Sequence, residues 1–136
     1  MKTLGLETLE QAREFFKKDR FATENGMTIE SVEPGHSVIR LELDETHLNA
    51  AGALMGGVPF TMADFACAVA ANFGPDAALT VSTNASIGFM SPCRGKVLFA
   101  EAVRVKKGRN LSFYEVSVKD DAGSFVARAS FTMFCK

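Results

Sequence analysis

The segment that most constrains the fold of this chain lies at residues 58–73, where apolar side chains occupy nearly every face of a predicted helix. A helix that is hydrophobic all round is buried, so the remaining elements must surround it. Pro59 suits a first helical turn, where its missing N–H costs nothing, and Asn72 with Gly74 and Pro75 ends the helix. The sequence therefore predicts one long central helix over residues 57–72.

Alternating apolar and polar side chains predict strands in most of the remaining chain. Residues 37–44 place Ile39, Leu41 and Leu43 on one face, and residues 27–32 are expected to pair with them through a turn at residues 33–36. A loosely helical pattern at residues 3–21 predicts a surface helix, and Gly88 is expected to mark a bulge. Four further strands are predicted at residues 78–90, 95–106, 110–119 and 124–134.

Length and charge limit the class of protein. The chain has 136 residues, so we expect a single α+β domain over residues 1–136. A net charge of -1 and a pI near 6.1 give no broad attraction for nucleic acid, which we exclude as a partner. No stretch approaches the ~18 to 20 apolar residues that span a bilayer. Because the N-terminus also lacks a secretory pattern, we expect a cytoplasmic protein that does not bind membranes.

Cysteine and histidine usage argues against metal and disulfide sites. Cys67, Cys93 and Cys135 form no C-x-x-C motif, so reduced and mostly buried thiols are expected. His36 and His47 are the two histidines of the sequence and have no metal-ligand spacing. We therefore expect no metal.

A carboxylate stands in the middle of the apolar helix. Asp64 has mostly apolar neighbours, and a buried carboxylate is normally paired, hydrogen-bonded or protonated. The same helix begins at Gly56 and Gly57, where backbone N–H groups lack intrahelical partners and the macrodipole is positive. Glycines let a ligand carbonyl approach closely, so this helix end can serve as an oxyanion hole. Each feature alone also fits an ordinary polar helix position or a tight turn.

Asp64 and Gly57 can act on one carbonyl only if two chains combine. Their spacing returns Asp64 to nearly the same helix face, but roughly 10 Å further along the axis. A shared site therefore needs the helix end of one subunit beside the helix middle of another, which implies an isologous dimer. Asn49, in the polar loop upstream, offers an amide that can orient water or substrate.

Several motifs follow one another in an order typical of one family. They are Asn49-x-x-Gly52-x-x-Met55-Gly56-Gly57, Met62-Ala63-Asp64 and Phe89-Met90-Ser91-Pro92, followed by a basic turn at residues 107–109 and a hairpin at residues 123–129. This order resembles the hotdog-fold acyl-CoA thioesterases of the phenylacetic-acid-degradation type, with the pattern N-x-x-G-x-x-H-G-G, L-A-D and F-[LM]-x-P. The resemblance covers roughly residues 20–134. It implies a hotdog fold, an antiparallel β-sheet wrapped around one long central helix.

The resemblance also implies roles for individual residues. The position of Asp64 carries the catalytic carboxylate, which activates water or attacks the thioester directly. Gly56 donates its backbone N–H to the thioester oxygen, and Asn49 positions water or thioester. A Ser or Thr assists from the next strand. We prefer Ser82 over Thr83, because neighbouring residues of a regular strand point to opposite faces.

One position departs from the family pattern. Met55 stands where the family has His before the paired glycines, and a thioether has no N–H donor and carries no charge. Loss of one oriented polar group commonly costs ~10² or more in rate. His47 is close in sequence and is a candidate to compensate, although a lone loop His is more often simply solvated.

The expected substrate is an acyl-CoA, so no separate cofactor is required. The acyl tail is expected to enter between subunits among Phe60, Phe65 and Phe89. The coenzyme phosphates are expected near Lys106 and the basic turn that follows it. The predicted substrate-binding residues are Met55, Gly57, Phe60, Thr83, Phe89, Lys107 and Arg109.

We therefore predict a homodimeric hydrolase of acyl- or arylacetyl-CoA, with two dimers joining as a homotetramer. The main alternative is a non-catalytic acyl-CoA or aromatic-acid binding protein, which Met55 favours and Asp64, Asn49 and Ser82 oppose. A hotdog dehydratase or hydratase fits less well, because its chemistry requires a His paired with the carboxylate and the predicted central helix has none.

Overall fold

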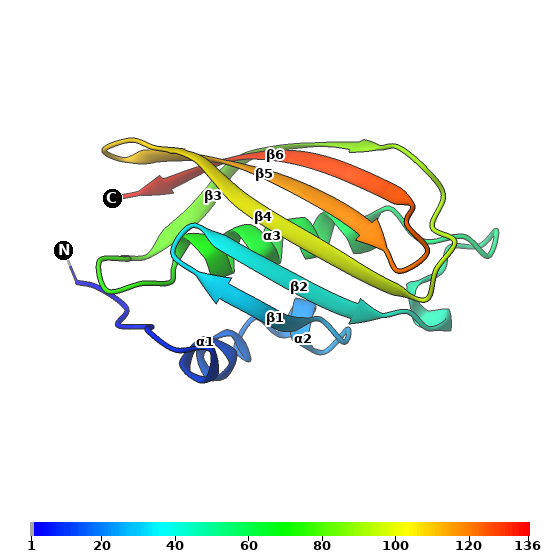
Figure 1. Cartoon of the computed structure of the whole chain (residues 1–136), viewed down its shortest axis with the longest axis horizontal. Helices are drawn as coiled ribbons and strands as arrows, with labels where there is room; N and C mark the ends of the chain where they lie inside the picture. The colour runs from blue at the N-terminus through cyan, green and yellow to red at the C-terminus, as the bar shows by residue number, and fades with distance from the viewer. Residues whose placement is uncertain (1) are drawn as a thin grey trace.

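The computed structural model describes residues 2–136 and consists of one curved antiparallel sheet around a helix (Figure 1). The strand order is β1-β2-β4-β5-β6-β3, so β1 and β3 form the two edges. The strand bounds are β1 Thr28–Glu33, β2 His36–Glu42, β3 Thr80–Phe89, β4 Val97–Lys107, β5 Leu111–Asp120 and β6 Phe125–Cys135. All neighbouring strands pair antiparallel, as the predicted hairpin and meander require.

The central helix α3, Gly57–Ala71, packs against the inner face of the sheet, as Figure 1 shows. Alternate residues of the strands point inward, and Ile39, Leu98 and Val116 are fully buried beneath the helix. This arrangement confirms the predicted α+β hotdog architecture. The helix differs from the prediction in one respect, because Thr61, Asp64 and Ala68 form a stripe that is not fully buried.

The N-terminal segment does not form the single helix that the sequence predicted. It folds as α1, Leu9–Phe16, and a short α2, Arg20–Thr23. Thr8 and Gln11 form a capping box that begins α1, which fixes where helix can start. Upstream, the chain is extended, with the Leu4 N–H donating to the carbonyl of Ala77. Helix α1 lies against β1, below the sheet in Figure 1, and α2 lies against α3.

The bulge in β3 lies elsewhere than predicted. Gly88 pairs in regular register with Arg128, whereas the register of β3 against β6 shifts between Ser82 and Asn84. The extra residue is Thr83, which opposes no partner on β6. The bulge therefore reorients side chains beside the middle of α3.

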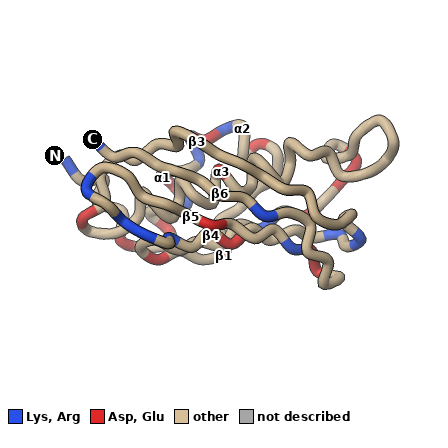
Figure 2. Tube along the Cα trace, turned by 90° about the horizontal axis from the view of Figure 1, so that it is seen from above, with Lys and Arg blue, Asp and Glu red and all other residues tan. Residues whose placement is uncertain are grey.

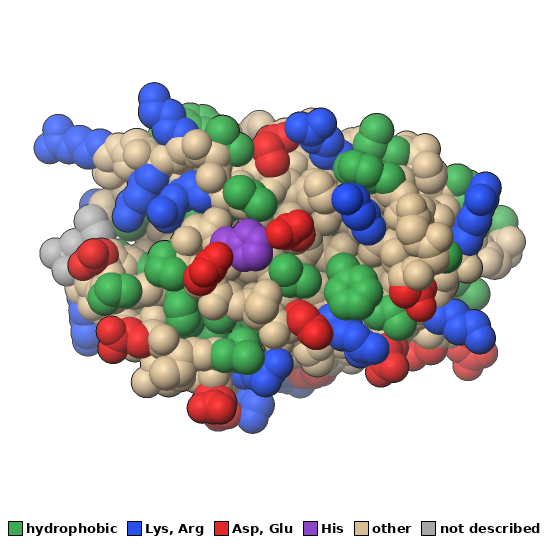
Figure 3. All heavy atoms as spheres, viewed as in Figure 1, with side chains coloured by type: hydrophobic (Ala, Val, Ile, Leu, Met, Phe, Trp, Pro, Cys, Tyr) green, Lys and Arg blue, Asp and Glu red, His purple; other side chains and the backbone are tan. Residues whose placement is uncertain are grey.

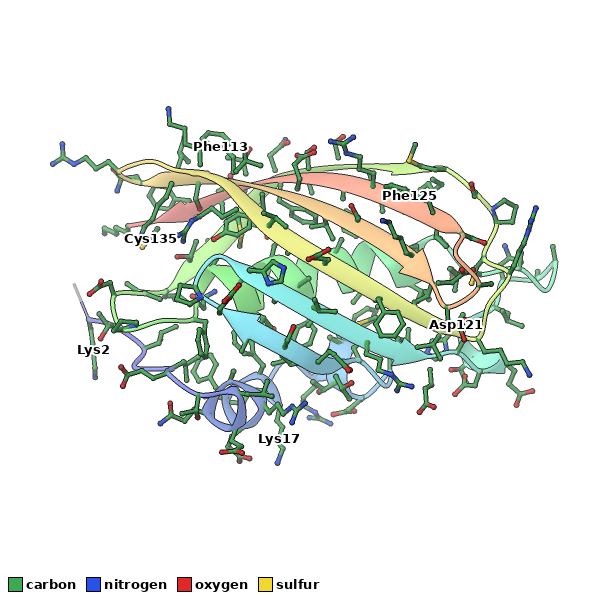
Figure 4. All side chains as sticks on the ribbon, in the orientation of Figure 1. Lys2, Lys17, Phe113, Asp121, Phe125 and Cys135 are labelled. Carbon is green, nitrogen blue, oxygen red and sulfur yellow. The ribbon has the colours of Figure 1, made fainter. Side chains whose placement is uncertain are left out.

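Two aspartates tie the loop after β3 to the β5–β6 hairpin. Asp120 accepts from the N–H groups of Arg94 and Gly95, and Asp121 accepts from that of Lys96. Burial alone would raise the pKa of Asp120, but these and further backbone donors outweigh it and hold the pKa far below its usual range. Asp121 lies at the opposite end of the sheet from Cys135 (Figure 4).

The surface carries both charge signs and one apolar edge. Figure 2 shows Lys, Arg, Asp and Glu interspersed along the trace. At the edge strand β3, Leu79 is 63%, Val81 51% and Phe89 61% exposed. Within residues 2–136, no helix is long and apolar enough to cross a membrane.

Candidate active site

Asp64 and Ser82 form the centre of the candidate site. Asp64 projects from the incompletely buried stripe of α3, and Ser82 projects from β3. The Ser82 hydroxyl donates to Oδ1 of Asp64 at 2.9 Å. This bond orients the carboxylate and leaves its second oxygen available to a water or a thioester carbon. The Asp64 side chain is exposed rather than buried in the single chain, contrary to its expected burial in the helix core.

The β3 bulge separates the two hydroxyl candidates that the sequence left open. Ser82 reaches Asp64, whereas the Thr83 Oγ1 donates to the carbonyl of Thr132 at 3.2 Å. The Thr83 hydroxyl therefore bonds to a backbone carbonyl of β6 where the β3–β6 pairing is interrupted, and it is not directed at the carboxylate. Ser82, preferred over Thr83 from the sequence, is therefore the residue beside Asp64.

Two hollows meet at Asp64. The larger, of about 460 Å³, is lined by Asp64, Ser82 and Asp19 together with apolar side chains. The smaller, of about 230 Å³, is lined by both carboxylates and by Thr61 and Phe21. Burial and then the charge of Asp64 raise the pKa of Asp19. The two carboxylates are therefore close enough to interact electrostatically.

The start of α3 provides free backbone donors. The N–H groups of Gly56 and Gly57 have no hydrogen-bond acceptor within the part of the chain that the structure describes. A hollow of about 440 Å³ reaches Gly56, and the Phe89 ring lies 3.1 Å from where a β-carbon on Gly56 would stand. Gly56 thus combines a free N–H with close aromatic packing. Met55 is next to it and 53% exposed.

Asn49 organises the loop before α3. Its Oδ1 accepts from the N–H groups of Ala51 and Ala53, at 2.9 and 3.1 Å. The carbonyl end of the amide is thus committed to the loop, as is usual for a turn-forming asparagine. The Nδ2 donors have no acceptor within residues 2–136, so the amide end is available to a substrate or water.

His47 is a structural residue rather than a solvated one. It is 3% exposed, its Nδ1 accepts from the Asp44 N–H at 3.0 Å and its Nε2 lies 2.8 Å from the Asn25 carbonyl. These contacts hold the ring in place and engage both of its nitrogens. With both ring nitrogens occupied, His47 cannot replace the histidine that Met55 lacks.

The predicted aromatic acyl site is only partly supported by the geometry. Phe65 is 3% exposed and packs edge-on against Phe16 with ring centroids 5.9 Å apart, so most of its ring lies in the core, although it borders the smaller hollow at Asp64. Phe60 stacks on Phe131 at 6.0 Å. Phe89 lines a separate hollow, the one beside Gly56.

Lys107 and Arg109 line a different hollow from the one at Asp64. It measures about 450 Å³, lies between the end of α3 and the β4–β5 hairpin, and includes Arg104. Basic side chains gather at this corner of the molecule in Figure 3. Of the described residues, no group of His, Cys, Asp and Glu is arranged to hold a metal.

Asp19 is the residue that sequence reasoning missed. It stands between Lys18 and Arg20, and such a run of charges normally indicates a solvated surface. No local pattern shows that the turn after α1 brings this carboxylate beside Asp64. A structure was needed to find it.

Comparison with known proteins gives consistent matches. A family model described as thioesterase superfamily matches residues 51–127. Human acyl-coenzyme A thioesterase 13 is 31% identical over 108 residues, which are 78% of this chain and 77% of that protein.

Solved structures match over most of the fold. The phenylacetic acid degradation protein PaaI of Thermus thermophilus, in a mutant form, is 29% identical with a TM-score of 0.78 and covers 87% of this chain and 100% of its own. The smu.793 protein of Streptococcus mutans UA159, solved bound to acetyl-CoA, is 26% identical with a TM-score of 0.74 and covers 82% of this chain and 89% of its own.

Proposed function

This chain belongs to the thioesterase superfamily, as its motifs predicted, and from that membership we propose that it hydrolyses the thioester of an acyl- or arylacetyl-CoA. The observation that carries the proposal is the 2.9 Å hydrogen bond between Ser82 and Asp64 on the open face of α3. An oriented carboxylate beside a hollow is what attack on a thioester carbon requires. Coenzyme A is part of the substrate, so the reaction needs no resident cofactor.

In the proposed reaction, Asp64 supplies the basic or nucleophilic oxygen. As a base, it takes a proton from water, the hydroxide oxygen bonds to the thioester carbon and the C–S bond breaks. As a nucleophile, it forms an acyl anhydride that water then cleaves. In both routes the thiolate of coenzyme A leaves and takes up a proton, and the Gly56 N–H stabilises the oxyanion that forms on the carbonyl oxygen.

The site requires two chains. Asp64 lies about 10 Å along the helix axis from Gly57, too far for both to contact one carbonyl. The edge strand β3, with exposed Val81 and with Leu79 just before its start, is a surface that a second copy can cover. We therefore propose an isologous homodimer in which Gly56 and Asn49 of one subunit face Asp64 of the other. A homotetramer of two such dimers remains our prediction.

The coenzyme is proposed to bind through its phosphates. Lys107 and Arg109 join Arg104 at one hollow, and clustered cations complement a polyanionic nucleotide. Met55, Phe60 and Phe89 are proposed to contact the substrate near the start of α3. A cytoplasmic location is proposed as well, and it fits Cys67 and Cys93, neither of which is part of a disulfide.

Thiol release from a panel of acyl-CoAs tests the proposal. Short, medium, long and phenylacetyl thioesters are incubated with purified protein, and the freed thiol is measured continuously. We expect turnover of at least one thioester, with one thiol released per acid formed. The alternative, a non-catalytic binding protein with Met55 in place of the family histidine, instead predicts saturable binding of the same thioesters without thiol release.

Replacing Met55 by His should raise kcat/KM by about tenfold, or ~1.4 kcal/mol of transition-state stabilisation. Met55 is largely exposed in the single chain, so an imidazole can be accommodated without disturbing the core. Met55→Gln is the matched control, because it adds an uncharged polar group of similar length. Thiol release and the melting temperature of both variants are compared. Equal rates for wild type and Met55→His would show that the missing histidine does not limit catalysis.

A further inference from the structure

One wall of the hollow at Asp64 is formed by N-terminal residues that lie outside the region matched by the thioesterase family model. The floor of the hollow is the face of α3 from Asp64 through Ala68 to Asn72, about 12 Å long at 1.5 Å rise per residue. One wall is the start of β3 with Val81, together with Leu79 just before the strand. The other wall is residues 15–19, which precede the matched residues 51–127. We call this hollow the Asp64 groove.

The far end of the Asp64 groove is formed by Asn72, whose side chain is fully hydrogen-bonded. Asn72 donates from Nδ2 to the carbonyls of Ala68 and Thr80 and accepts the Thr80 N–H at 2.9 Å. With its polar atoms satisfied, this end of the groove offers no partner for a charged group. Phe15, Phe16 and Met133 make the remaining lining largely apolar.

The ionisable groups that line the groove and the adjoining smaller hollow are two carboxylates and two cations. Lys18 holds its ammonium over the Phe15 ring, 4.3 Å from the ring centroid. Arg20 is paired with Glu24. The Asp64 carboxylate accepts a hydrogen bond from the Ser82 hydroxyl.

The remaining group is Asp19, whose carboxylate makes no ion pair within residues 2–136. An unpaired carboxylate beside a second one repels any further anion in the groove.

We propose that Asp19 is a specificity-determining residue that excludes acyl groups with a second anionic group from the Asp64 groove and restricts the site to neutral acyl chains. The inference rests on the proposed thioester hydrolysis at Asp64. A thioester carbon placed at Asp64 puts the first carbons of its acyl chain in the same hollow as Asp19. A neutral chain then meets apolar walls, whereas an ω-carboxylate meets an unpaired like charge.

Hexanoyl-CoA and adipoyl-CoA test the proposal, because both carry six-carbon acyl chains and only the second ends in a carboxylate. Their kcat/KM values are compared in wild type, Asp19→Asn and Asp19→Glu. Glu14→Gln is the matched control: it removes one negative charge from α1, but Glu14 pairs with Lys17 and does not line the groove. Hexanoyl-CoA hydrolysis also reports that each variant is folded.

We expect wild type to prefer hexanoyl-CoA and Asp19→Asn to reduce that preference about fivefold, the upper range for one unit charge on an exposed side chain. Asp19→Glu and Glu14→Gln should retain the wild-type preference. High salt should weaken the preference of wild type and leave that of Asp19→Asn unchanged.

An Asp19→Asn preference within twofold of wild type, with hexanoyl-CoA still hydrolysed, overturns the role of Asp19 and leaves the proposed function standing. If no protein releases thiol from these two thioesters or from any other member of the acyl-CoA panel, the proposed function is overturned, and the specificity proposal falls with it.

Discussion

The Asp64→Asn variant should lose thioester hydrolysis by about 10³-fold in kcat, the scale expected when a general base or nucleophile is removed. The amide keeps the size of the side chain, and its oxygen still accepts the Ser82 hydroxyl. It cannot take a proton from water or attack a carbonyl carbon. KM should therefore change little while kcat falls, as for an interaction made only in the transition state.

Stability measurements separate this outcome from misfolding. The Asp64 side chain is exposed on α3 and its hydrogen bond with Ser82 can be kept by an amide, so the melting temperature of the Asn variant should match that of wild type. Glu30→Gln is a suitable control, because Glu30 is an exposed carboxylate on β1, the edge strand opposite β3. An Asp64→Asn variant with the turnover of wild type would contradict the assignment.

Local chemistry made the central helix and the strands predictable. Pro59 at the start of α3 and the stop at Asn72 follow from backbone geometry that depends on few neighbours. The strand alternation likewise reports burial residue by residue. The structure bears out both features, with strand ends shifted by one or two residues.

Features that depend on distant contacts were not predictable. The solvated role assigned to His47 was wrong, because its burial depends on the Asn25 carbonyl, 22 residues away in sequence. Phe65 was expected in the acyl site and lies largely in the core, at the border of the smaller hollow, because α1 places Phe16 against it. Asp19 was missed for the same reason. A single sequence carries no signal for which surface a short N-terminal helix covers.

The bulge in β3 shows that a residue can be chosen correctly from a wrong assumption about strand geometry. The sequence placed it at Gly88, where a missing side chain suggests weak pairing. In the structure the bulge is at Thr83, where the alternation of side chains along β3 is interrupted. Ser82, just before the bulge, lies beside Asp64. The choice of Ser82 rested on a regular strand, whereas the geometry depends on the irregularity.

The central claim is a site that combines Asp64 of one subunit with the Gly56 N–H of another, and subunit mixing tests it. Gly56→Pro removes that N–H at a φ of -58°, which suits proline, and should cost about 10²-fold to 10³-fold in kcat. Gly56→Ala is the matched control, because it adds the same contact with Phe89 and keeps the donor. Ultracentrifugation should first show that each protein is at least a dimer.

Asp64→Asn and Gly56→Pro chains carrying different affinity tags are then co-expressed, and the mixed dimer is purified through both tags. Its two sites are unequal: one pairs the intact Asp64 with the intact Gly56, and the other holds both substitutions. The decisive measurement is thiol release by this mixed dimer. A shared site predicts about half of the wild-type rate from two nearly inactive parents, whereas a site contained in one chain predicts a mixed dimer as inactive as its parents.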